Sequence, residues 1–94
     1  MSTVMLLIPR RTQLAEAEAR ELIKRLELLT GERAAGNAIS RIRFALTDNQ
    51  EQTLTPSEAA AIHAVLSTWL TEDPPEDATS RARLEKLQRA TSPI

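Results

Sequence analysis

The strongest constraint on the fold lies in the middle of the chain, where a complete helix-start signal precedes a long apolar stripe. Thr55 can accept a hydrogen bond from an unpaired first-turn N–H, and Pro56 suits the first helical position. Glu58 follows Thr55 by three residues and completes a capping box. We therefore predict a helix that begins at Pro56. Its apolar stripe consists of Ala59, Ile62, Val65, Leu66, Trp69 and Leu70.

The opposite side of this predicted helix, which we call the back face, carries only small uncharged residues. They are Ala60, Ala61, Ala64, Ser67, Thr68 and Thr71. A helix that faces water on one side normally places charged residues there. We therefore predict that the back face is covered, either by the chain itself or by a second copy. The alternative is that alanine occurs there simply because it favours helices.

A second helix is predicted from Gln13 to about Leu29, with Thr12 as its cap. Gly31 follows and can adopt the left-handed conformation that ends helices. The apolar stripe of this helix consists of Ala15, Ala19, Leu22, Ile23, Leu26 and Leu29.

The segment from Glu32 to Leu46 is predicted to be a third helix. Gly36 and Asn37 weaken its first turn, so an alternative start is Asn37. Its stripe consists of Ala35, Ala38, Ile39, Ile42, Ala45 and Leu46. Phe44 does not fit this pattern, because it points almost directly away from the stripe. The alternative is a strand over residues 40–47, which would place Phe44 on one face with Ile42 and Leu46. In the helical interpretation, we expect Phe44 to contact the N-terminal arm or a second protomer.

The two ends of the chain are less regular. Residues 1–11 are expected to form an apolar N-terminal arm or a short strand, too short for a signal peptide or a membrane span. Pro74 and Pro75 end the central helix and open a proline-rich connector. A weaker helix follows, capped by Thr79 or Ser80 and continuing to about Ala90. Because its apolar stripe is mainly Leu84 and Leu87, it is expected to be loosely attached or to fold only on a partner, and residues 91–94 are expected to fray.

These patterns predict a single all-α domain over residues 1–94. It would be a small helical bundle of three main helices within residues 12–73, with residues 74–94 forming the connector and the weaker C-terminal helix. The net charge is −1, and there is no cysteine. That composition excludes a disulfide framework and is compatible with a cytoplasmic protein. The acidic residues concentrate in residues 48–77, which contain no Lys or Arg.

We find no pattern that indicates catalysis, a cofactor or a metal, and we predict that the protein is not an enzyme. His63 and Ser67 are four residues apart on one helix, but the sequence offers neither an orienting acid nor an oxyanion loop. His63 is the only histidine, so a metal site would depend on carboxylates. We interpret it as a residue at the edge of the core. The paired acids at residues 72–73 and 76–77 are interpreted as a solvated linker.

We therefore predict a protein–protein interaction or regulatory module that forms a homodimer and binds another protein. The predicted contact residues are Val4, Leu6, Ile8, Phe44, Ala60, Ala64 and Trp69. The alternative is a nucleic-acid-binding transcriptional regulator that uses the basic N-terminal half, through Arg10, Arg11, Arg41 and Arg43. The acidic segment that contains the central helix would be repelled by phosphates, which makes this alternative weaker.

Overall fold

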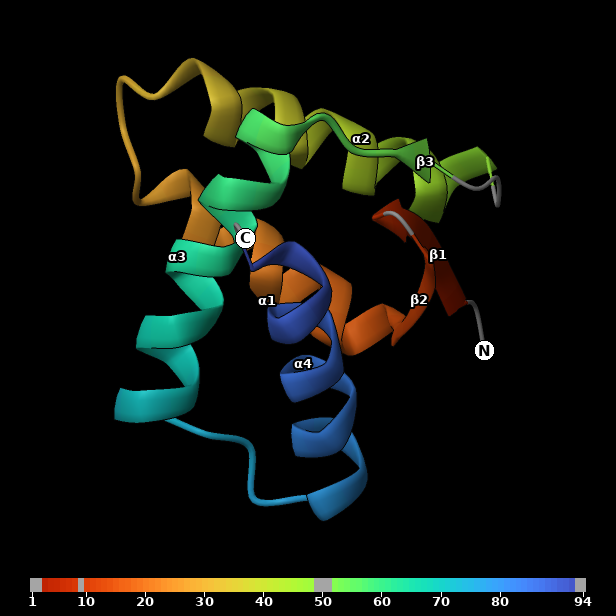
Figure 1. Ribbon diagram of the computed structural model, residues 1–94, viewed down its shortest axis with the longest axis vertical. Helices are drawn as coiled ribbons and strands as arrows, with labels where there is room; N and C mark the ends of the chain where they lie inside the picture. Colours follow the sequence, from red (N-terminus) through yellow and green to blue (C-terminus); the bar gives the residue numbers. More distant parts are fainter. Residues whose placement is uncertain (1–2, 9, 49–51, 93–94) are drawn as a thin grey trace.

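The computed structural model describes residues 3–8, 10–48 and 52–92, with side chains described from Gln13 onward. These residues contain four helices that pack into a small bundle, with a short sheet at one end (Figure 1). The predicted all-α bundle with an N-terminal strand is confirmed. The helices are α1 (Glu16–Glu27), α2 (Arg33–Asp48), α3 (Pro56–Glu72) and α4 (Ala78–Thr91).

The sheet is built mainly from the N-terminal arm. Strands β1 (Thr3–Ile8) and β2 (Arg10–Ala15) pair in antiparallel register along their whole length. The two-residue strand β3 (Gln52–Thr53) runs parallel to β1 on its other edge, which gives the order β2-β1-β3. The arm therefore takes the strand form, one of its two predicted forms.

The predicted start of the first helix is wrong, because residues 10–15 belong to β2 and α1 begins only at Glu16. Thr12 therefore does not cap the helix. Ala15 occupies the N-cap position, and its amide donates a hydrogen bond of 3.0 Å to the carboxylate of Glu18. Pairing with β1 gives hydrogen-bond partners to the backbone groups of residues 10–15 that face β1, which competes with helix formation there.

The core lies where the apolar stripes of the helices meet. The predicted stripe of α3 is confirmed: Ala59, Ile62, Val65, Leu66 and Trp69 are buried, and Leu70 is half-buried against the core. Residues 40–47 are helical, which settles the choice between helix and strand in favour of α2. Gly36 lies inside this helix rather than before it.

Helix α4 is docked firmly, contrary to the loose attachment that its thin stripe suggested. It runs beside α3 (Figure 1), and Leu84 and Leu87 are completely buried. Its cap is Asp77, whose carboxylate accepts from the amide of Ser80, rather than Thr79 or Ser80. Thr91 is also buried, so the helix does not fray there. Two leucines are enough to attach α4, because both side chains are completely buried in the core.

The back face of α3 is only partly covered. Ala61 is buried and Ser67 is half-buried, with its hydroxyl accepting a hydrogen bond of 3.1 Å from Gln88 of α4. The other four residues are exposed in the single chain: Ala60, Ala64, Thr68 and Thr71. The prediction that the chain's own packing could cover this face is therefore wrong for those four, because α4 lies to one side of it.

Candidate functional site

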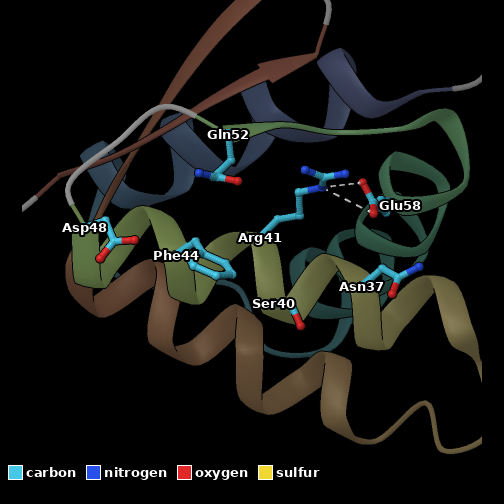
Figure 2. Close-up of a pocket in the computed structure, with 7 residues that line it drawn as sticks. All are labelled: Asn37, Ser40, Arg41, Phe44, Asp48, Gln52 and Glu58. Carbon is cyan, nitrogen blue, oxygen red and sulfur yellow. Dashed lines mark hydrogen bonds and ion pairs between the residues drawn. The ribbon is translucent and has the colours of Figure 1, made fainter.

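A groove of about 590 Å³ lies over α2, and we call it the α2 groove. Figure 2 shows Arg41 and Phe44 projecting from α2, with Gln52 facing them from β3 and Glu58 from α3. Three consecutive elements of the chain therefore form its walls. Its lining consists of Asn37, Ser40, Arg41, Phe44, Asp48, Gln52 and Glu58.

Phe44 is the main apolar surface in this groove. The buried residues of α2 all point to the opposite side of the helix, so Phe44 must face outward. Its exposed fraction is 57%, and among large apolar side chains in the described part only Leu28 is more exposed. Phe44 also lines an adjoining hollow of about 270 Å³, together with Arg43 and Thr47. The prediction that Phe44 lies off the helix stripe is confirmed, whereas the predicted contact with the arm cannot be placed, since the arm's side chains lie outside the described part.

One wall of the groove is fixed by an ion pair between α2 and α3. The Nε of Arg41 donates to both carboxylate oxygens of Glu58, at 3.1 and 3.4 Å. The same carboxylate accepts from the amide of Thr55 at 2.8 Å, while the Thr55 hydroxyl accepts from the amide of Glu58. The predicted capping box is confirmed, and it holds a Glu58 side chain that is only 4% exposed. Arg41 is therefore held in the wall.

A second buried glutamate has the same arrangement away from the groove. Glu18 in α1 accepts from the Ala15 amide and, through both carboxylate oxygens, from Arg83 of α4 at 2.6 to 3.0 Å. Burial acts to raise the pKa of Glu18. The hydrogen bonds from Arg83, the Ala15 amide and Ser80, with the Arg83 charge, outweigh burial and place the pKa below its ordinary value. This pair ties α4 to α1 and leaves the groove unaffected.

The seven predicted contact residues do not form one surface. Only Phe44 lies in the α2 groove, while Ala60 and Ala64 are exposed on α3. Trp69 belongs to the core: it is 5% exposed, and the guanidinium of Arg25 lies 4.7 Å from its ring centre. The remaining three residues are in β1, and their side chains lie outside the described part: Val4, Leu6 and Ile8.

The four arginines predicted for the nucleic-acid alternative are divided between α2 and β2. Arg41 is paired with Glu58, and Arg43 lies 3.8 Å from Glu27, both side chains of that pair being largely exposed. Arg10 and Arg11 are in β2, and their side chains lie outside the described part. The described residues therefore do not show a basic cluster formed by all four arginines.

Sequence reasoning missed the polar lining of the groove, formed by Asn37, Ser40, Asp48 and Gln52. The first three share a helix side with Phe44, so the direction in which Phe44 points could have identified them. Gln52 could not be identified this way, because only the pairing of β3 with β1 brings it over α2.

The polar residues between α3 and α4 do not form a catalytic pair. The Nδ1 of His63 lies 2.9 Å from the backbone carbonyl of Gln88, and the Ser67 hydroxyl donates to the backbone carbonyl of His63. The serine hydroxyl therefore donates to the backbone and not to the imidazole. No group of three potential metal-binding side chains occurs in the described residues. No helix within them is long and apolar enough to cross a membrane.

Comparisons of the chain with known protein families, with curated proteins and with solved structures found no match.

Proposed function

We propose that this protein is a small non-catalytic interaction module that acts as a homodimer and binds another protein in the α2 groove. The observation that supports the proposal is Phe44, a large aromatic side chain held outward in a groove of about 590 Å³. Aromatic residues are enriched at the centres of protein interfaces, where they are surrounded by polar groups.

The surroundings of Phe44 fit this role. Helix α2 holds its backbone, and the Arg41–Glu58 pair holds the adjacent wall, so Arg41 would lose little side-chain freedom on binding. Ser40, Asp48 and Gln52 supply hydrogen-bonding groups around the ring. A partner that places an apolar side chain on Phe44 and polar groups at the rim would match this surface.

Cross-linking in the native host tests the proposal. A photoreactive phenylalanine analogue placed at Ser40, which lines the groove and is exposed, should capture a defined partner. The same analogue at Ala82, an exposed residue of α4, is the matched control. In the Ser40 protein, adding Phe44→Ser should lower capture about tenfold or more, as expected for loss of an interface hot spot. Equal capture with and without Phe44 would contradict the proposal.

A nucleic-acid-binding regulator is the second candidate, and one observation favours it. Phe44 lines both the α2 groove and the adjoining hollow, with Arg41 in the lining of the first and Arg43 in the lining of the second. Aromatic rings flanked by guanidinium groups are used to stack unpaired bases. The carboxylates of Asp48 and Glu58 in the groove oppose this candidate, because they repel phosphates.

Fluorescence anisotropy separates the two candidates. Labelled single-stranded and duplex oligonucleotides of random sequence, at low salt, should show no binding to the protein below tens of micromolar. Binding there that weakens steeply with added salt and disappears in Phe44→Ser would favour the nucleic-acid candidate.

We also propose the cytoplasm as the compartment of the protein. A chain without cysteine gains nothing from an oxidising environment.

A further inference from the structure

A second groove, of about 270 Å³, lies where the end of α1 meets the exposed side of α3, and we call it the α1–α3 groove. Its apolar and small lining residues are Leu28, Leu29, Ala64, Val65 and Thr68. Arg25 and Glu72 complete the lining with opposite charges. The α2 groove shares none of these residues.

This groove contains both a projection and a hollow. Leu28 is 78% exposed, the highest value among the large apolar side chains described. It follows α1 directly, and its amide still bonds to the carbonyl of Arg25 at 3.2 Å, so its backbone is held. On the other wall, Ala64 and Thr68 are exposed. Their side chains are short, so the surface of α3 forms the hollow there.

We propose that the α1–α3 groove is a dimer interface whose occupant is a second copy of this chain. In this dimer, a two-fold axis places Leu28 of each copy in the groove of the other. A two-fold interface uses the same patch on both copies, so the patch must be complementary to itself. A patch that carries a projecting leucine beside a hollow lined by small residues meets that condition. The inference rests on the homodimer in the proposed function and specifies its interface.

The charges around this groove favour an antiparallel arrangement of the two α3 helices. Exposed positions of α3 from Pro56 to Thr71 carry no charged side chain, so close approach would not bury a charge there. The acidic residues Glu72 and Asp73 lie at the C-terminal end of α3. In an antiparallel pair, each acidic end lies near the partner's helix N-terminus, where the helix dipole favours negative charge.

The salt-bridge pattern agrees with that arrangement. Arg25 donates to Asp73 at 3.0 Å and also bonds to Glu21, which neutralises part of the acidic end. Glu72, the other charged residue that lines the groove, is exposed. In the antiparallel pair, Glu72 is therefore the acidic residue left to lie near the partner's helix N-terminus.

Sedimentation velocity on the full chain tests the proposal directly. We expect a reversible dimer of the 10.4 kDa chain at tens of micromolar. A chain that stays monomeric at hundreds of micromolar would overturn the inference. That result would leave Phe44-dependent cross-linking to a partner protein unaffected, so failure of the interface and failure of the α2 groove can be told apart.

Charge-introducing variants then locate the interface. Leu28→Glu and Ala64→Glu should each weaken dimerisation about thirtyfold or more, because each would bury a charge at the centre of the interface. Ala82→Glu on α4 and Phe44→Glu in the α2 groove are the matched controls and should leave the dimer constant unchanged. All four positions are exposed, and circular dichroism checks that each variant folds. A dimer disrupted by Phe44→Glu but not by Leu28→Glu would overturn the assignment.

Discussion

Glu18 and Glu58 occupy the same position, the third residue of a helix, and act in the same way. Each carboxylate accepts the amide of its own N-cap residue and the guanidinium of an arginine from another helix. One side chain therefore satisfies a helix end and joins two helices. Charged hydrogen bonds of this kind are stronger than neutral ones, and both carboxylates are almost fully buried.

The lowered pKa of Glu18 predicts a pH dependence of stability. Because the folded-state pKa lies below the ordinary value of 4.5, ionised Glu18 stabilises the fold above that pH. The contribution is lost as pH falls through the folded-state pKa. Urea denaturation from neutral pH to about pH 3 should therefore show a steeper loss of unfolding free energy in the native chain than in Glu18→Gln. Identical pH profiles would mean that Glu18 does not gain stability from Arg83.

At the scale of helices and turns, the two glycines act in different ways. Gly31 follows α1 with a φ of 85°, in the left-handed region, whereas Gly36 lies inside α2. A Cβ added to either residue would meet no atom within 4 Å. Any difference in stability between the two alanine variants must therefore come from the backbone conformation and not from a clash of the added Cβ.

Opposite effects are expected from the two alanine substitutions. Gly31→Ala should lower the unfolding free energy by about 1 kcal/mol, because alanine resists the left-handed conformation. Gly36→Ala should raise it by about 0.5–1 kcal/mol, because alanine favours the helix. Thermal or urea denaturation of both variants measures this directly. A stabilising Gly31→Ala would show that the turn after α1 does not require a positive φ.

At the scale of the whole molecule, α4 is part of the same core as the other helices. Leu84 and Leu87 are fully buried in the cluster that includes Leu22, Ile62 and Leu66. Arg83 ties α4 to α1, and Gln88 ties it to α3. The helix after the proline-rich connector is therefore expected to unfold together with the rest.

Leu84→Ala tests this cooperativity. It should lower the global unfolding free energy by about 2–5 kcal/mol, as for other large-to-small changes in a core. Trp69 is the only tryptophan, so its fluorescence reports on α3, while circular dichroism reports on all four helices. The two probes should give one coincident transition. A circular dichroism transition that precedes an unchanged fluorescence transition would mean that α4 detaches separately.

Local signals in the sequence were sufficient for most of the helices. The capping box at Thr55, the stripe of α3 and the outward position of Phe44 depend on spacing within one helix, which the chain specifies by itself. The start of α1 was misplaced because Ala15 fits the helix stripe and Thr12 is a plausible cap, while pairing with the neighbouring strand β1 decided the conformation of residues 10–15. The attachment of α4 was underestimated because it depends on the complete burial of Leu84 and Leu87 and on Arg83 reaching Glu18 across 65 residues.

The sequence by itself determined the helical class, the helix ends marked by caps and the core side of each helix, since these depend on neighbours within a few turns. Only the tertiary structure decided the sheet, the partners of Glu18 and Glu58, and which part of the back face α4 covers. It also placed Phe44 and Leu28 in separate grooves. Apart from the local pairing of β1 with β2, those features depend on residues far apart in the chain, and no local spacing encodes which helices will meet.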